Sequence, residues 1–257
     1  MSISLKLYSV YHKPFFIPNA DYVIPIQAGK TLSNLDLKVA ADNTGDNISD
    51  LNGTFCELTV KYWIWKNAER ITSHWGLCHY RRYVMQKPAI YFKAPRLKDF
   101  TASQENIDKV LDDDLYDQLC SLLQKHDVII QQPMNIHKNK QGFFNLKEHY
   151  ERDHIASDWQ AVMNAIKKLY PDYAKSLDSF NKSYKMSFFN MMVAPWQIWD
   201  DYLKWLFDIL FEVKKNIKIS DDAYQSRVFG FMSERLINLY ILHNKLDPAY
   251  LPVAVFK

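Results

Sequence analysis

A short apolar run that stops abruptly at basic and aromatic residues restricts the fold of this chain more than any other segment. Residues Ile71 to Cys78 show the period-two pattern of a buried β-strand. The residues that follow are His79-Tyr80-Arg81-Arg82-Tyr83. Because ligands bind beyond the carboxyl ends of strands in open α/β sheets, this order predicts an α/β fold with a site here. In an extended chain, His79 and Arg81 would face one way. Tyr80 and Arg82 would face the other.

The two adjacent arginines predict an anion nearby. Burying two guanidinium groups together costs several kcal/mol unless anions pair with them. A diphosphate is suitable, because the guanidinium fork matches phosphate oxygens and stays charged at any working pH. Ion pairs with neighbouring carboxylates are the structural alternative, and such networks imitate functional sites. The segment alone leaves both interpretations open.

The segment GLCHYRRY (76–83) belongs to a wider series of blocks. TGDNIS (44–49) and CELTVKYWIWKN (56–67) precede it, and RVFGFMSERL (227–236) follows much later. In this order, over residues 8–253, the chain resembles a family of bacterial proteins from capsule, exopolysaccharide and O-antigen gene clusters. That family was long described as a domain of unknown function and is now treated as glycosyltransferases of the GT-A type. The resemblance implies transfer of a sugar from a nucleotide donor.

Length and composition fit this fold class. The 257 residues are 48% hydrophobic and 24% charged, which suits one large α/β domain. We expect a GT-A-like mixed sheet flanked by helices, with long C-terminal helices. Within a single glycosyltransferase domain, a nucleotide-binding part would cover about 1–130 and an acceptor or helical part about 131–257.

Several classes of protein are excluded by charge and residue usage. A net charge of +3 without a Lys/Arg stripe argues against general nucleic-acid binding. Only 6 glycines are present, which argues against a glycine-rich phosphate loop. Cys56, Cys78 and Cys120 lie in apolar runs without CxxC spacing, as reduced thiols of a cytoplasmic protein do. No apolar run approaches the ~20 residues that span a bilayer, so membrane contact is expected to be peripheral.

A second polar strand end follows the predicted strand from Leu5 to Tyr11. His12, Lys13 and Pro14 come directly after it. In a nucleotide-binding fold, Tyr11 would stack on uracil and Lys13 would reach a phosphate. A surface turn opened by Pro14 is the alternative.

Two further segments hold polar residues that suit a donor. Asp42, Thr44, Asp46 and Asn47 lie in a long polar loop, where they could hold ribose hydroxyls or the donor sugar. The alternative is Asx-turn chemistry, in which these side chains bond their own backbone, and the two roles are compatible. Asn190 falls in a predicted buried strand, 186–194, where its amide needs hydrogen-bonding partners or contacts a sugar.

The helices carry the remaining candidates. Thr54 and Glu57 form a capping-box pattern that predicts one helix to about Asn67, whereas the resemblance implies a ligand contact for Glu57. An inverting transferase needs a base beside the acceptor hydroxyl. Asp222, before a predicted helix at 223–243, and Glu148, on a helix at 146–154, are the candidates. For Glu148 a solvated helix face is the alternative.

The expected site uses cationic side chains in place of a metal. GT-A enzymes usually carry Asp-x-Asp at the end of a central strand, and here the corresponding place holds His79-Tyr80-Arg81. Cationic side chains neutralise a leaving diphosphate as a metal does. We therefore expect no cofactor and a catalytic role for Arg81. If Mn²⁺ or Mg²⁺ were needed, its ligands would be Asp42, Asp46 and Asp222. His149 and His154 are five residues apart and miss the spacing of a zinc helix.

The resemblance implies a specific reaction. A hexose, with galactose or galactofuranose favoured, would pass from a UDP-sugar to a glycan on a polyprenyl diphosphate at the inner membrane face. The residues expected to bind the donor are Tyr11, His12, Lys13, Asp42, Thr44, Asp46, Asn47, His79, Tyr80, Arg81, Arg82 and Asn190. Those expected in catalysis are Arg81, Glu148 and Asp222. A module that binds nucleotide sugars or glycans without catalysis is the alternative function.

Overall fold

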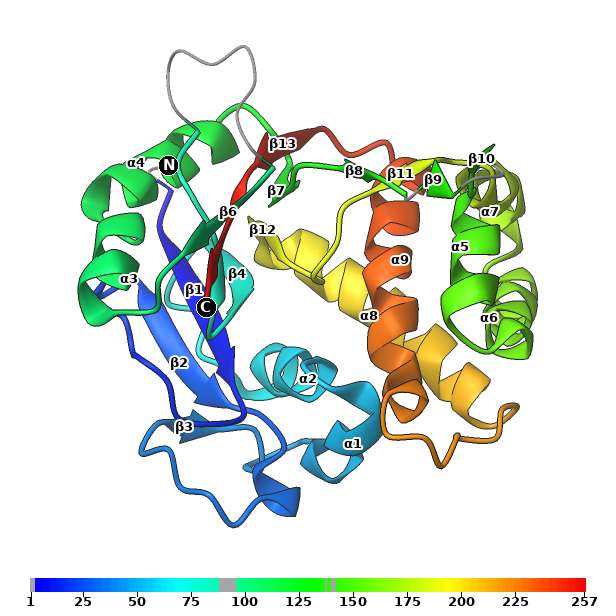
Figure 1. The fold of residues 1–257 in the computed structure, drawn as a ribbon, viewed down its shortest axis with the longest axis horizontal. Helices are drawn as coiled ribbons and strands as arrows, with labels where there is room; N and C mark the ends of the chain where they lie inside the picture. The colour runs from blue at the N-terminus through cyan, green and yellow to red at the C-terminus, as the bar shows by residue number, and fades with distance from the viewer. Residues whose placement is uncertain (1–2, 88–95, 137, 140–141) are drawn as a thin grey trace.

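The computed structural model describes residues 3–87, 96–136, 138–139 and 142–257, which form a mixed α/β fold (Figure 1). The strands are β1 (Leu5–Tyr11), β2 (Val23–Gln27), β3 (Ala40–Ala41), β4 (His74–His79), β5 (Arg82–Val84), β6 (Leu97–Phe100), β7 (Val128–Gln131), β8 (Met134–Asn135), β9 (Lys138–Asn139), β10 (Gly142–Phe143), β11 (Lys185–Met186), β12 (Met192–Pro195), β13 (Pro248–Leu251) and β14 (Val253–Phe256). The α-helices are α1 (Asn52–Phe55), α2 (Leu58–Asn67), α3 (Gln104–Val110), α4 (Asp113–Leu123), α5 (Leu146–Asp153), α6 (Ala156–Leu169), α7 (Ala174–Asn181), α8 (Trp196–Lys214) and α9 (Val228–His243). Short 3-10 helices are η1 (Lys30–Leu32), η2 (Ser49–Leu51), η3 (Pro171–Tyr173) and η4 (Gln225–Arg227).

The main sheet has 10 strands, and its central order is β13-β7-β12-β4-β1-β2-β3. The strands β4, β1, β2 and β3 are parallel, whereas β12 is antiparallel to β4 and β7. The register pairs Val10 of β1 with His79 of β4, so these two strands end side by side. Two strand ends that the sequence marks as polar therefore meet at one edge of the sheet. Two small two-stranded sheets, β9–β10 and β8–β11, lie outside this sheet.

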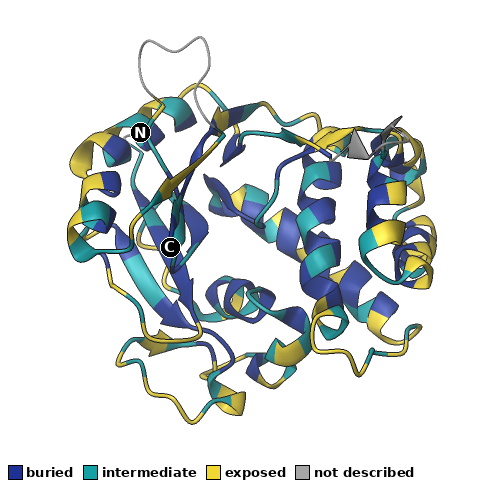
Figure 2. Cartoon of the chain, in the orientation of Figure 1, coloured by how far each residue is buried: buried dark blue, intermediate teal, exposed yellow. Residues whose placement is uncertain are grey.

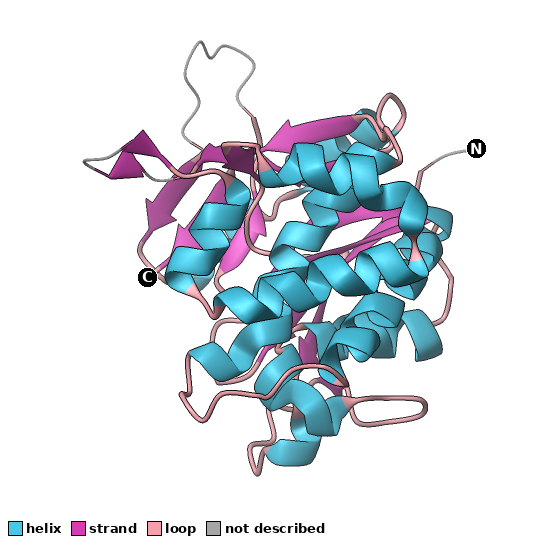
Figure 3. Cartoon of the chain, turned by 90° about the vertical axis from the view of Figure 1, so that its right-hand side faces the viewer, coloured by secondary structure: helices cyan, strands magenta, loops and turns pink. Residues whose placement is uncertain are grey.

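Helices cover both faces of the sheet, because the buried strands are apolar on both sides (Figure 2). The helices α3 and α4 pack on one face of the sheet, while α2, α8 and α9 pack on the other. The view in Figure 3 shows the helical layer in front of the strands. Alternate residues of β1 point to opposite faces: Leu7 packs in the cluster with α3 and α4, and Tyr8 packs in the cluster with α2, α8 and α9.

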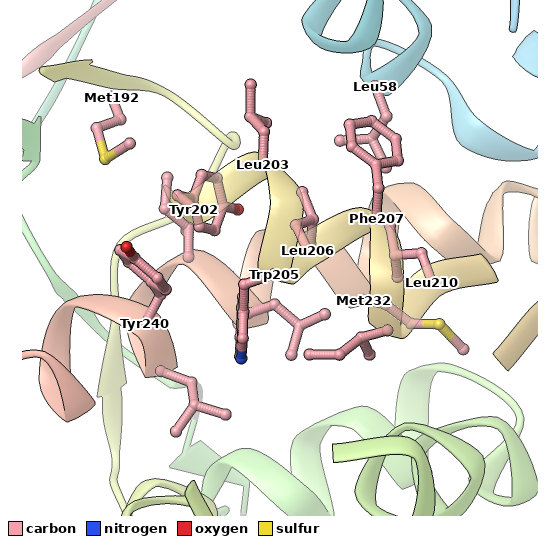
Figure 4. Close-up of a cluster of buried hydrophobic side chains, with 14 of the residues drawn as sticks. Leu58, Met192, Tyr202, Leu203, Trp205, Leu206, Phe207, Leu210, Met232 and Tyr240 are labelled. Carbon is pink, nitrogen blue, oxygen red and sulfur yellow. The ribbon is translucent and has the colours of Figure 1, made fainter. Parts of the chain in front are cut away.

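The helix α8 is the centre of the larger cluster. Leu203, Leu206 and Leu210 follow one face of this helix and are buried between Leu58 of α2 and Met232 of α9 (Figure 4). A stacked pair attaches the helix to the sheet. The rings of Trp75 in β4 and Trp199 in α8 lie 3.9 Å apart, and Trp199 Nε1 donates to the carbonyl oxygen of Trp75 at 2.8 Å. The two contacts hold α8 against the start of β4.

The fold class expected from the sequence is confirmed, and so are most of its regular elements. The predicted strand at 5–11 is β1, and the expected long C-terminal helices are α8 and α9. A break at Asp112 separates α3 from α4, and the Asp112 carboxylate accepts from the backbone nitrogen of Leu115 as an N-cap.

Three local predictions are wrong. The helix expected from Thr54 to Asn67 is broken at Cys56, whose φ of 52° ends α1. Thr54 Oγ1 donates to the carbonyl oxygen of Leu51 and makes no capping box with Glu57. Gly230 of α9 lies against this bend, where an added Cβ would be 3.4 Å from Cys56 Sγ.

The other two errors concern the strand at 186–194 and the start of the last long helix, whereas the extended course of residues 79–82 was only a condition. His79 and Arg82 form the pair that opens a β4–β5 hairpin, so the chain turns at residues 80–81 and does not continue extended. The predicted strand at 186–194 is divided into β11 and β12 by a turn with positive φ at Phe189 and Asn190. The last long helix begins at Val228, five residues after the predicted start, because η4 occupies the first turn.

Candidate functional site

The β4–β5 hairpin positions the two arginines differently. Residues directly opposite in an antiparallel pair point to the same face, so His79 and Arg82 lie together. Arg81 is in the turn, with its guanidinium carbon 5.6 Å from the ring centroid of Tyr80. The guanidinium of Arg82 lies over the ring of Phe189, at 5.1 Å.

The carboxylate partners of the structural alternative are not seen for these arginines. Among the described side chains, no Asp or Glu oxygen lies within 4.0 Å of Arg81 or Arg82. Both side chains are partly buried. Burial, and then the positive charge of Arg81, lowers the pKa of Arg82. Two half-buried cations held together in this way would be stabilised by an anion at the strand end.

His79 is held in one tautomer. Its Nε2 lies 2.6 Å from the carbonyl oxygen of Phe189, which can only accept, so Nε2 carries the hydrogen. Burial lowers the pKa of His79, although Glu57 and this carbonyl favour the charged form. The ring is therefore neutral at pH 7, with Nδ1 as a hydrogen-bond acceptor.

The turn opposite His79 has unusual backbone angles. Phe189 and Asn190 have φ values of 73° and 57°, in the left-handed region that bulky residues rarely adopt. Two carboxylates hold it there: Glu234 accepts from the backbone nitrogen of Phe189 at 2.7 Å, and Glu57 accepts from Asn190 Nδ2 at 2.6 Å. Ser233 Oγ donates to Asn190 Oδ1 at 2.9 Å. Backbone strain that persists under such constraint is typical of functional sites.

Asn190 thus has the hydrogen-bonding partners that its burial requires, and it is only 1% exposed. Its amide is bonded to Glu57, Ser233 and the carbonyl oxygen of Gly230. The sequence left open whether Asn190 bonds within the protein or contacts a sugar, and these contacts favour bonding within the protein. A sugar contact by Asn190 stays a prediction.

Two carboxylates, Glu57 and Glu234, influence the charged groups of this hairpin. Both act electrostatically on Arg82, and Glu57 also acts on His79. Burial raises the pKa of Glu234, while the charges of Arg235 and Arg82 oppose the rise. Sequence reasoning assigned no site role to Glu234. Its one signal was its position in the RVFGFMSERL block, and only the fold brings that block to the end of β4.

The polar residues after β1 join the same edge. The His12 ring is 5.0 Å from the Tyr80 ring, and Lys13 Nζ lies 5.8 Å from the same ring. Partial burial, and then the charge of Lys13, lowers the pKa of His12; Arg81 and Arg227 act in the same direction. We call this group the strand-end site: His12, Lys13, Glu57, His79, Arg81, Arg82, Phe189, Asn190 and Glu234.

Tyr11 does not present its ring at this edge. It is 2% exposed, and its hydroxyl donates to the carbonyl oxygen of Phe16 at 2.9 Å and bonds to Tyr83. Strand alternation places the ring in the interior, so it has no open face for a uracil base. The burial of Tyr11 therefore contradicts the stacking role that the sequence predicted for it.

The loop residues 42–47 are engaged with the protein itself. The Asp42 carboxylate is fully buried and accepts from Thr59, Ser49 and the backbone nitrogens of residues 29 and 30. Trp63 Nε1 donates to Thr44 Oγ1, and Tyr62 donates to the Asp46 carboxylate. Asn47 Oδ1 accepts from the backbone nitrogen of residue 49. Turn chemistry and packing on α2 therefore account for this loop, and its donor role is untested.

The two predicted bases also form local caps. Asp222 Oδ1 accepts from the backbone nitrogens of Tyr224 and Gln225. Glu148 completes a capping box with Asn145 at the start of α5. Both are exposed, and within the described chain neither hydrogen-bonds to the strand-end site. Their catalytic roles stay predictions.

The described residues show neither a cluster of metal ligands nor a helix that could cross a membrane. No group of three or more His, Cys, Asp and Glu side chains is arranged to hold a metal ion in the part of the chain that is described. At the end of β4, where a divalent metal would need oxygen ligands, the side chains are imidazole, phenol and guanidinium. Across the described helices, none is both long and apolar enough to cross a membrane.

Comparisons with known proteins agree with the fold. No curated protein matches the chain. A solved structure called "WbbM bifunctional glycosytransferase apo structure" is similar, with 30% sequence identity and a TM-score of 0.88. The similarity covers 99% of this chain and 45% of that one, so the chain spans under half the length of that protein. A family described as "Domain of unknown function (DUF4422)" matches residues 6–245. The chain therefore belongs to the DUF4422 family.

Proposed function

We propose that this chain is a glycosyltransferase that uses a nucleotide-sugar donor. The observation that carries the proposal is the similarity over 99% of the chain to a structure named as a bifunctional glycosyltransferase. The strand-end site agrees with it, because Arg81 and Arg82 lie at a carboxyl strand edge without carboxylate partners among the described residues. Ligands of α/β sheets bind at such edges.

In this proposal the arginines neutralise the diphosphate as it leaves. Charge increases on the diphosphate oxygens when the bond to the sugar breaks, and fixed cations stabilise that charge. Arg82 is held over Phe189, and Lys13 approaches the same edge from β1. This arrangement supports a metal-independent reaction.

The acceptor hydroxyl needs a base in an inverting reaction. Glu57 and Glu234 are the better-placed candidates, since both act electrostatically on Arg82. Burial raises the pKa of Glu234, and a carboxylate with a raised pKa is the stronger base. Asp222 and Glu148 would need a movement that releases their helix caps.

For the donor and the acceptor we keep the prediction made from the sequence. The donor would be a UDP-hexose, with galactose or galactofuranose favoured, and the acceptor a polyprenyl-diphosphate-linked glycan of a surface polysaccharide. The chain would then contact the inner face of the membrane peripherally. The family resemblance supports these choices.

The first prediction concerns the two arginines. Replacing Arg82 or Arg81 by Ala should lower kcat on the order of 10²-fold, and more than it raises KM, because the charge acts mainly in the transition state. Lys should restore only part of the rate, since it lacks the bidentate fork. The measurement is UDP release from UDP-hexoses by purified protein, with thermal melts of each variant.

The matched control is Arg70→Ala. Arg70 pairs with Asp200 at the surface, at 2.7 Å, away from the strand-end site. Its removal should leave kcat unchanged. If Arg81→Ala and Arg82→Ala fold stably and keep wild-type kcat, the hairpin is not in the active site. UDP binding without any turnover would instead indicate the non-catalytic module.

The second prediction concerns metals. If guanidinium groups take the place of a metal, UDP release should persist in excess EDTA with little loss. The measurement compares rates with EDTA, with EDTA followed by Mn²⁺, and without additions. Complete inactivation that Mn²⁺ reverses would show that the diphosphate has a metal partner.

A further inference from the structure

Arg227 is an arginine of the helical layer that approaches the strand-end site. It is the N-cap residue of α9, and its Nε donates to Cys56 Sγ at 3.5 Å, at the break between α1 and α2. The start of α9 lies beside α1 in Figure 1 as well. Its guanidinium carbon is 5.6 Å from the ring centroid of Phe231. These contacts place Arg227 next to the segment of Glu57, whose carboxylate accepts from Asn190.

The charge of Arg227 has no carboxylate partner. In the part of the chain that the structure describes, no Asp or Glu oxygen lies within 4.0 Å of its guanidinium, and its only hydrogen bond goes to a sulfur, which is a weak acceptor. The first turn of α9 also lacks an acidic residue, so the positive end of the helix dipole opposes a cation at this place. The side chain is exposed, and its Nη groups are therefore accessible to a ligand.

Arg227 and the arginine hairpin act on the same imidazole. Burial lowers the pKa of His12, and the charges of Lys13, Arg81 and Arg227 lower it further. These three cations come from three different places in the fold: the end of β1, the turn after β4 and the start of α9. The His12 ring lies 5.0 Å from the Tyr80 ring, and the Arg81 guanidinium carbon is 5.6 Å from that ring. An anion among these cations would relieve their mutual repulsion.

We propose that Arg227 binds the diphosphate of the nucleotide donor from the helical layer, while the arginine hairpin binds it from the sheet edge. This inference rests on the glycosyl transfer proposed above. A guanidinium makes two parallel hydrogen bonds to phosphate oxygens, and a diphosphate has enough oxygens for more than one arginine. The bound diphosphate then links the end of β4 to the start of α9.

The test separates the diphosphate from the rest of the nucleotide. Calorimetry measures the binding of UDP, inorganic pyrophosphate and uridine to the full chain and to Arg227→Ala. Loss of a charge-assisted hydrogen bond should weaken the binding of UDP and of pyrophosphate by about tenfold or more, and change uridine binding by less than about twofold. The UDP affinity of the variant should also fall less steeply with rising salt, because one cation fewer contributes to the attraction.

The matched control is Arg70→Ala. Arg70 also lies over an aromatic ring, with its guanidinium carbon 4.8 Å from the ring centroid of Trp196, but it pairs with Asp200. This variant should bind UDP like the wild type. Arg227→Lys keeps the charge without the fork and should recover part of the lost affinity. Arg227→Gln removes the charge but keeps most of the stem beside Cys56, and it replaces Arg227→Ala if thermal melts show that the Ala variant does not fold.

The outcomes distinguish this inference from the proposed function. If Arg227→Ala folds and binds UDP within about twofold of the wild type, Arg227 is not a diphosphate ligand, while the proposed function stands. If the variant loses uridine binding as much as UDP binding, the loss does not arise at the diphosphate, and the inference is again overturned. If the wild type binds neither UDP nor pyrophosphate, the proposed donor site fails, and the role of Arg227 fails with it.

Discussion

The side chain of Lys61 should make the free energy of unfolding depend on pH. Its pKa is lowered to about 8 in the fold, from 10.5 in the unfolded chain. Between these values the unfolded chain binds more protons, so stability rises as pH increases through this window. Below pH 8 the buried charge costs on the order of 3 kcal/mol. The groups that face it are Glu57 on its own segment, His79 on β4 and Tyr202 on α8.

The third prediction after those for the arginines and the metal therefore compares Lys61→Met with the wild type. The variant should be more stable at pH 7, and its advantage should shrink as pH rises from 8 to 10.5. Urea unfolding at several pH values measures this difference, and other titrating groups cancel in the comparison. A constant difference across the window would mean that Lys61 is solvated or paired in the fold.

Residue chemistry in the sequence predicted part of the strand-end site. His79, Arg81, Arg82 and Lys13 were found because each directly follows an apolar strand, and that signal is local. Lys61 and Glu234 were missed because each lies in an ordinary helical pattern, where a charge usually faces water. Their burial depends on contacts with segments more than 40 residues away, which no local pattern contains.

At the level of elements, the α5–α9 contact contains two histidines that burial keeps neutral. Arg235 Nη2 donates to His149 Nδ1 at 3.0 Å, and His154 stacks on Phe231 with ring centroids 4.0 Å apart. Burial, and then the charge of Arg235, lowers the pKa of each histidine to about 4. Protonating either ring would place a positive charge against Arg235.

The resulting prediction is a loss of stability in mild acid. Both folded-state pKa values lie below the ordinary value of 6.5, so the unfolded chain takes up protons first as pH falls from 6.5 to 4. The melting temperature should fall across this window. His154→Phe keeps the stack on Phe231 and removes one titration, so its melting temperature should fall less steeply. Equal slopes for variant and wild type would contradict the role of His154.

Element boundaries show where sequence patterns are limited. Thr54 and Glu57 have the spacing of a capping box, but the Glu57 side chain accepts a hydrogen bond from Asn190, 133 residues away. The apolar run at 186–194 has strand composition, yet Glu57 and Glu234 hold Phe189 and Asn190 in a left-handed turn. In both places a tertiary hydrogen bond overrides the local preference.

At the scale of the whole molecule, alternation and helical periodicity were sufficient for the fold class. The strands buried on both faces and the helices that cover them follow from apolar runs and amphipathic stripes. The sheet order was beyond reach, because β12 enters between β4 and β7 from a distant part of the chain. Short strands such as β5 carry too few residues to show a pattern.

The pairing of β14 with β5 affects how the chain folds in time. Val255 pairs with Arg82, and the backbone nitrogen of Phe256 donates to the carbonyl oxygen of Arg81 at 2.9 Å. During synthesis at ~5–20 residues per second, the hairpin waits roughly 10 to 30 s for this strand. Contacts between such distant segments form slowly in refolding too. The arginine hairpin therefore gains its last backbone partner only after the distant segment that holds β14 has been made.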